Sequence, residues 1–127
     1  MGRGSADGPR KVVRKQIAER GDIYHLDLRP SSGREQTGRH YVLIMTSRDY
    51  NATHLPYVAP ITTVGNASRV GGTYVSLTGA GTSVTGIIQL DQVKAVDLVA
   101  RNASRTGESV PPELMDDVLA RFAAVFE

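Results

Sequence analysis

The chain has 127 residues, of which 40% are hydrophobic, so it can form one small domain with its own core. It contains no cysteine, which excludes disulfides and thiolate metal sites. No apolar run is long enough to span a bilayer, and no signal-peptide pattern is present near the N-terminus. The composition predicts a cytoplasmic protein without a membrane partner, whose small core would benefit from a dimer interface.

The formal net charge of +2 is unevenly distributed along the chain. Residues 1–20 carry six basic and two acidic residues, whereas the rest of the chain carries nine basic and 11 acidic ones. Residues 1–19 are poor in apolar side chains and are predicted to be a flexible basic arm. Such an arm is either a solvated tail or a source of phosphate affinity through counterion release. Residues 20–127 are predicted to be the folded domain.

The first predicted strand follows Gly21 and stops at the turn-forming residues 30–33. Its side chains alternate between an apolar and a polar face, with Ile23 as the exception. The apolar face carries Tyr24, Leu26 and Leu28, and the polar face carries His25, Asp27 and Arg29.

Two further strands are predicted in the first half of the chain. Residues 41–45 form a continuous apolar run that is typical of a central strand, and residues 47–51 indicate a turn or one helical turn. Residues 57–62 form the next strand, in which Pro60 favours an edge or a bulge.

In the second half, residues 63–72 indicate a loop, and residues 73–77, 86–91 and 93–98 indicate short strands, with a turn at 79–82. A helix is predicted after the two prolines at 111 and 112. Its apolar side chains recur at helical spacing and are Leu114, Val118, Phe122 and Val125, with Met115, Leu119 and Phe126 beside them. This wide stripe packs on a sheet and could also close a dimer. The pattern predicts a mainly β fold, a small antiparallel barrel with a C-terminal helix.

The loop Gly33–Gly38 is the most informative segment, because it places the carboxylate of Glu35 between arginines at the junction of two predicted strands. Charged groups on a loop of this kind suit contact with a phosphodiester backbone.

Several segments in order along residues 20–127 carry a resemblance to a known family. They are Arg20-Gly21-Asp22-Ile23, Arg29-Pro30, Gly33-Arg34-Glu35-Gln36, Tyr50-Asn51, Leu55-Pro56, Ala59-Pro60-Ile61-Thr62, Gly65-Asn66, Arg69, Val75-Ser76-Leu77, Thr85-Gly86-Ile87 and Asp91-Gln92. Together with the C-terminal helix, this set resembles the MazF/PemK family of toxin endoribonucleases, and the PemK and ChpB branch in particular.

The resemblance implies an SH3-like barrel of the CcdB type that forms a homodimer. It implies a type II toxin that cleaves single-stranded RNA at short sequences, needs no metal or other cofactor, and is blocked by a cognate antitoxin protein.

Metal-free cleavage uses the ribose 2′-OH as nucleophile and leaves a 2′,3′-cyclic phosphate and a 5′-OH. It requires a base, an acid and a cation for the phosphorane charge. The resemblance assigns catalytic positions to Glu35, Thr62 and Asp91, and the chemistry of imidazole adds His40. Candidate substrate-binding residues are Arg34, Gln36, Arg39, Thr63, Asn66, Arg69, Gln89 and Gln92.

The chain departs from the family pattern at three candidate positions. Where the family has an arginine followed by proline, this chain has His40-Tyr41, and Arg39 is a possible substitute one residue earlier. Gln89 occupies the position of an arginine two residues before the aspartate, and Arg34 occupies that of a loop histidine. A neutral His40 would anchor phosphate less well than arginine.

Other interpretations remain open. The alternative role for Asp91 is to hold a turn, and that for Thr62 is to cap a strand end. His25 and His54 are expected to be surface residues, and the three histidines lack a regular metal-ligand spacing, so no metal is predicted. Tyr24, Tyr50 and Tyr57 suit either packing or base stacking. The alternatives to an active ribonuclease are a weakened relic that binds RNA or antitoxin, and a CcdB-like gyrase-binding toxin. The absence of tryptophan disfavours the latter.

Overall fold

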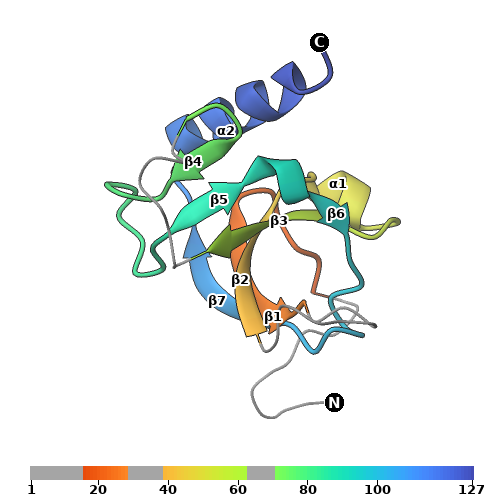
Figure 1. Ribbon diagram of the computed structural model, residues 1–127. Helices are drawn as coiled ribbons and strands as arrows, with labels where there is room; N and C mark the ends of the chain where they lie inside the picture. The colour runs from red at the N-terminus through yellow and green to blue at the C-terminus, as the bar shows by residue number, and fades with distance from the viewer. Residues whose placement is uncertain (1–15, 29–38, 63–70) are drawn as a thin grey trace, which may run out of the picture.

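A computed structural model describes residues 16–28, 39–62 and 71–127 (Figure 1). Most of the predicted arm and the loops at 29–38 and 63–70 lie outside the described residues. Seven strands form one antiparallel, barrel-like sheet in the order β4-β5-β3-β2-β1-β7, and β6 also pairs with β3. The strands are β1 (Asp22–Asp27), β2 (Arg39–Ile44), β3 (Tyr57–Thr62), β4 (Tyr74–Ser76), β5 (Ile87–Gln89), β6 (Lys94–Ala95) and β7 (Ser104–Ser109).

Three helical segments lie among the described residues. The short α1 (Arg48–Asn51) begins after Ser47, whose side chain accepts a hydrogen bond from the Tyr50 amide. A 3₁₀ turn, η2 (Leu90–Gln92), follows β5 directly. The long α2 (Pro112–Ala124) begins with Pro112, whose missing N–H costs nothing in a first helical turn. Among the described residues, neither α1 nor α2 has the length and apolar character that a bilayer crossing requires.

The central strands bury side chains on both faces, and each face has its own core. One cluster includes Leu43 of β2 and Ile61 of β3 together with Met115 and Val118 of α2. The other cluster has no residue of α2, and its members are Ala18, Tyr24, Leu26, Leu28, Val42, Ile44, Val58, Val96, Leu98 and Ala103. The continuous apolar run in β2 is explained by this burial on both faces.

The two cores also explain Ile23, the exception to the alternation in β1. Ile23 is fully buried in the cluster beneath α2, whereas Tyr24, Leu26 and Leu28 are buried in the other cluster. Successive side chains of a strand point to opposite faces, so Ile23 is on the face that follows from its position. The face of β1 that was predicted to be polar is therefore apolar at the start of the strand, where it carries Ile23.

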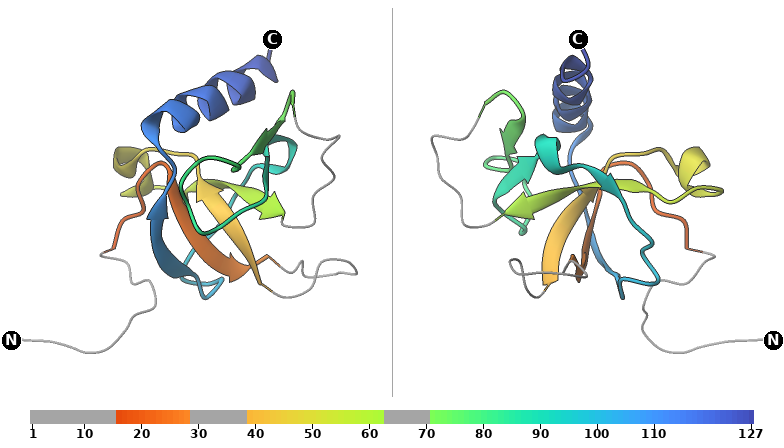
Figure 2. Two further views of the ribbon diagram at one scale, coloured as in Figure 1. Left: turned by 90° about the vertical axis from the view of Figure 1, so that its left-hand side faces the viewer. Right: turned by 45° about the vertical axis from the view of Figure 1, so that its right-hand side comes forward.

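Helix α2 lies across one end of the barrel-like sheet, the end at which β4 lies (Figures 1 and 2). Met115 and Val118 are its buried residues, and Leu114, Leu119 and Phe122 pack partly against the same cluster. Its C-terminal end is different, because Val125 and Phe126 are 48% and 75% exposed. The predicted apolar stripe is thus a core contact at its start and an uncovered surface at its end.

The structure corrects the predicted elements in three places. The strand expected at 86–91 ends at Gln89 and continues as the 3₁₀ turn, and the strand expected at 93–98 has only two residues. Ala18, within the predicted arm, is 3% exposed, and its carbonyl accepts a bond from the Asn51 side-chain amide. The third correction is β7, which the sequence analysis did not predict.

Polar contacts hold β7 at the edge of the sheet. It has no buried side chain, and it pairs with β1 through a register that shifts between Asp22 and Tyr24. The Thr106 hydroxyl donates to the Ile23 carbonyl at 2.6 Å. The Glu108 carboxylate accepts bonds from the Ser83 hydroxyl and from the amides of residues 83 and 84. The same bonds, that of the Ser83 hydroxyl foremost, hold the pKa of Glu108 below its usual value.

Gly86 fixes the junction between β3 and β5. Its φ of +128° is a conformation that side chains rarely adopt, and a Cβ there would overlap the Thr62 carbonyl oxygen and lie 3.0 Å from its carbon. Thr62 is paired with Ile87 across this junction. The absence of a side chain at position 86 therefore sets how closely the end of β3 approaches β5.

We expect Gly86→Ala to destabilise the fold by at least about 2 kcal/mol, because backbone strain adds to a clash with main-chain atoms. Urea denaturation measures this loss. Gly79→Ala is the matched control, since Gly79 has a φ of +81° with nothing within 4 Å of the added carbon. Equal losses in the two variants would show that the approach to Thr62 has no energetic role.

Candidate functional site

A cavity of about 410 Å³ lies where β3 meets β2, β5 and β6. Its polar lining comes from five elements: His40 from β2, Thr62 from β3, Gln89 from β5, Gln92 from η2, and Lys94 from β6. Leu28, Pro60 and Ile61 complete the described lining. Four of the predicted site residues, His40, Thr62, Gln89 and Gln92, are thus brought together.

Strand register explains why these side chains converge. Paired residues of antiparallel strands, and alternate residues of one strand, share a face. Val42 pairs with Pro60, which puts His40 on the face of Pro60 and Thr62. Val58, on the same face, pairs with Lys94, and Ile87 pairs with Thr62, which places Gln89 there as well. The cavity therefore continues the face that carries the second core.

The described lining combines hydrogen-bond donors with one positive charge. Among the described residues that line the cavity, none is an aspartate or glutamate. The Nε2 atom of His40 is buried, and it has no hydrogen-bond partner within the part of the chain that the structure describes. His40 lines the cavity, and an imidazole can both donate and accept a proton. The two glutamine amides, the threonine hydroxyl and the ammonium group are all able to donate to an anion.

Arg39 and Asp91 lie outside this lining in the structure. The Nη2 atom of Arg39 donates to the carbonyls of His25 and Asn102 at 2.8 and 2.9 Å, between β1 and the segment before β7. Asp91 is exposed on η2, and its Oδ2 accepts a 2.8 Å bond from the Tyr74 hydroxyl. Arg39 thus binds main-chain oxygens and Asp91 is held against β4, so neither side chain joins His40 in the lining of the cavity.

The remaining predicted site residues are not among the described residues. They are the candidate base Glu35 and the candidate substrate-binding residues Arg34, Gln36, Thr63, Asn66 and Arg69.

Lys94 is the lining residue that the sequence analysis missed. It has no motif of its own, and the strand that carries it has only two residues. The signal that could have found it is the pairing of β6 with β3, which aligns Lys94 with Val58. That pairing joins distant parts of the chain and cannot be read from local alternation.

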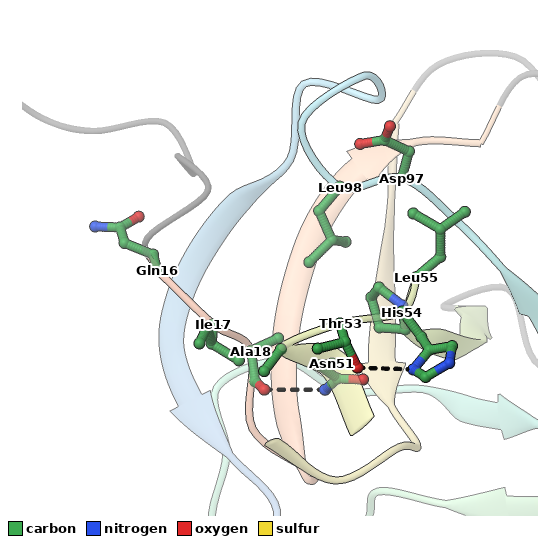
Figure 3. Close-up of a pocket in the computed structure, with 11 residues that line it drawn as sticks. Gln16, Ile17, Ala18, Asn51, Thr53, His54, Leu55, Asp97 and Leu98 are labelled. Atoms are coloured by element: carbon green, nitrogen blue, oxygen red, sulfur yellow. Dashed lines mark hydrogen bonds between the residues drawn. The ribbon is translucent and has the colours of Figure 1, made fainter. Parts of the chain in front are cut away.

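A second cavity of about 410 Å³ lies near α1 and the segment after β6 (Figure 3). Its lining includes Asn51, His54, Leu55 and Asp97, and none of the predicted site residues. The Asn51 amide donates to the Ala18 carbonyl at 2.9 Å, and His54 Nδ1 lies 3.0 Å from the Thr53 hydroxyl. The ring of His54 also stacks on that of Tyr50 with centroids 4.3 Å apart. These contacts make His54 part of a surface aromatic group.

His25 packs against the ring of Tyr41, with centroids 4.6 Å apart. Its Nδ1 lies 3.3 Å from the Nε of Arg39 and accepts that N–H. Burial lowers the pKa of His25 below its ordinary value of 6.5, and the nearby Arg39 and His40 lower it further. Within the described ranges, no group of three or more histidine, aspartate or glutamate side chains is arranged to hold a metal.

Fold and cavity define a class of protein: a small barrel-like β domain with a C-terminal helix and a cavity whose described lining suits an anionic substrate. The PemK-like, MazF-like toxins of type II toxin–antitoxin systems match residues 19–126. Endoribonuclease PemK of Escherichia coli is 42% identical over 91% of this chain and 87% of its own. Endoribonuclease toxin ChpB of E. coli K12 is 37% identical over 91% of this chain and all of its own.

Solved structures agree on the fold. A chain from the crystal structure of the MazE–MazF complex of Deinococcus radiodurans superposes with a TM-score of 0.73 at 23% identity, over 87% of this chain and 96% of its own. The chain belongs to the PemK-like, MazF-like toxin family, as the motifs of the sequence indicate.

We expect Arg39→Gln to raise the pKa of His25 toward 6.5, because it removes a positive charge beside the imidazole. NMR titration of the histidine ring protons measures the change, and Arg48→Gln on the exposed α1 is the control. In the wild type, the folded state binds the His25 proton more weakly than the unfolded chain does. Its contribution to stability is therefore lost as the pH falls below about 6.5. An unchanged His25 pKa in Arg39→Gln would contradict the contact.

Proposed function

We propose that the chain is the toxin of a type II toxin–antitoxin system and that it cleaves single-stranded RNA without a metal, acting in the cytoplasm on messenger RNA. The 2′-OH attacks the adjacent phosphorus, the bond to the 5′-oxygen breaks, and the products carry a 2′,3′-cyclic phosphate and a 5′-OH. Family membership supports this proposal, and so do the two Escherichia coli relatives, which are named endoribonucleases.

The observation that carries the proposal is the cavity with His40, Thr62, two glutamine amides and one cation. A phosphodiester brings negative charge, and that charge grows as the phosphorane forms. Donors already fixed on a sheet stabilise such charge without the reorganisation that water would need. The same lining would also suit other anions, such as an acidic peptide, better than a cation. RNA cleavage therefore has to be tested directly.

In the proposed mechanism His40 transfers a proton, as base toward the 2′-OH or as acid toward the 5′-oxygen. The Thr62 hydroxyl and the amides of Gln89 and Gln92 donate to phosphate oxygens. Glu35 remains the candidate for the second proton-transfer role on the strength of the family motif. Asp91 would act on the substrate only if the reacting RNA extends beyond the described cavity toward η2.

The test is cleavage of a long single-stranded RNA by purified protein in EDTA, with the ends mapped. We expect discrete cuts with cyclic phosphate and 5′-OH ends. His40→Gln should lower the rate about 10²- to 10⁴-fold, the usual contribution of general acid–base catalysis. His54→Gln, on the surface aromatic group, is the matched control and should cleave as the wild type does. Full activity of His40→Gln would exclude proton transfer by His40, and no cleavage by the folded wild type would reject the ribonuclease.

We also propose that the chain binds a cognate antitoxin, which the family description and the MazE–MazF complex of the relative support. The basic residues at positions 1–20 are proposed to add phosphate affinity to RNA binding.

A homodimer is proposed from the exposed apolar end of α2. Val125 and Phe126 are 48% and 75% exposed, and the Phe126 ring meets the Phe122 ring edge-on at 5.4 Å. We expect Phe126→Asp to shift the protein from dimer to monomer in sedimentation velocity, because a carboxylate is costly in an apolar interface. Val99→Asp, at a side chain that is 55% exposed, is the control. A monomeric wild type, or an unchanged Phe126→Asp dimer, would reject this interface.

A further inference from the structure

Lys94 is the source of positive charge in the described lining of the cavity. It begins β6, and its backbone is held opposite Val58 of β3. The face that carries Val58 also carries Pro60 and Thr62, and all three of Lys94, Pro60 and Thr62 line the cavity. The β-ladder therefore fixes the base of the lysine side chain, while its flexible stem lets the ammonium group adjust to a ligand.

The charge of Lys94 is not used elsewhere in the described structure. No ion pair or hydrogen bond joins its ammonium group to another described residue, and the lining that surrounds it has no described carboxylate. Arg39 provides the contrast, since its guanidinium already binds two main-chain carbonyls. Of these two cations, the lysine is the one in the cavity with its donors available.

His40 and Gln89 line the same cavity as Lys94. Neither an imidazole in its neutral form nor an amide balances a phosphodiester charge. The ammonium group of Lys94, which reaches the cavity from β6, is the group of the described lining that does.

We infer that Lys94 contacts the scissile phosphodiester and stabilises the negative charge of the phosphorane, beside His40 and Thr62. The inference rests on the proposed ribonuclease function. Lys94 neither gains nor loses a proton in the step. The 2′-OH proton passes to the base, the P–O5′ bond breaks as the P–O2′ bond forms, and the acid protonates the 5′-oxygen.

Lys94→Met and Lys94→Arg test this inference. We expect Lys94→Met to lower kcat about 10²-fold, as removal of one donor to a developing oxyanion does. Lys94→Arg keeps the charge and should recover most of the rate. Lys94 is exposed, so neither substitution should change Tm. Arg48→Met removes a positive charge from the exposed α1 and serves as the matched control, with kcat near that of the wild type.

A binding measurement separates this inference from the proposed function. The probe is a single-stranded RNA with 2′-O-methyl riboses, which binds but has no 2′-OH to attack. For one phosphate contact, the slope of log K against log salt should become about 0.7 less steep in Lys94→Met and stay unchanged in Arg48→Met.

The outcomes are distinct. A wild type that cleaves, with Lys94→Met equally fast and equally salt-dependent, overturns the role of Lys94 and leaves the ribonuclease intact. A wild type that does not cleave rejects the proposed function. The salt slope then still decides whether Lys94 contacts a phosphate, and an unchanged slope overturns that contact.

Discussion

The antiparallel register that joins β1, β2, β3 and β6 is the constraint on which both cores and the cavity depend. A slip of one residue between β2 and β3 would exchange the two faces of the strand that moved. Val42 and Ile44 would leave one cluster for the other, and His40 would turn away from Thr62. Because the central strands are buried on both faces, such a slip would disrupt both cores. The energy that fixes the fold thus also fixes the polar groups of the cavity.

The cavity lies at the margin of the second core, where the apolar face ends. Leu28 and Pro60 belong to its lining, and Val58 lies buried two residues before Pro60 on the same strand. Beyond this point the same face continues with His40, Thr62 and Gln89, which are partly exposed. Close packing holds one end of each strand in the core. The polar residues follow directly on the same strands, so their backbones have little freedom to move. Gly86 adds to this rigidity by allowing β5 to lie against the Thr62 carbonyl.

The sequence predicted the elements whose own side chains are buried in a regular pattern. Alternation identified β1, the apolar run identified β2, and helical spacing identified α2, because in each case the burial pattern appears in consecutive residues of the element. It failed for β7, whose polar side chains pair with β1 and bond to the backbone without burying any apolar group. The sequence analysis named four polar residues of the cavity but not Lys94, because the place of Lys94 is set by the ladder between β6 and β3. Arg39 was a reasonable substitute by sequence distance, yet its strand position directs it to the carbonyls of His25 and Asn102.

A site that binds phosphate needs a positive charge close to the phosphate oxygens. The charge stabilises the phosphate whichever strand carries the residue. In this chain β2 contributes an imidazole and β5 an amide at the positions where the sequence resemblance predicts arginines, while β6 brings an ammonium group to the same cavity. The exchange changes more than the origin of the charge. A guanidinium fixes two phosphate oxygens at once, whereas an ammonium group acts as a point charge on a flexible stem. In the proposed site, orientation of the phosphate would then depend more on Thr62 and the two glutamine amides, whose backbones the sheet holds in place. Phosphate binding would therefore rest on donors from several neighbouring elements and not on a guanidinium alone.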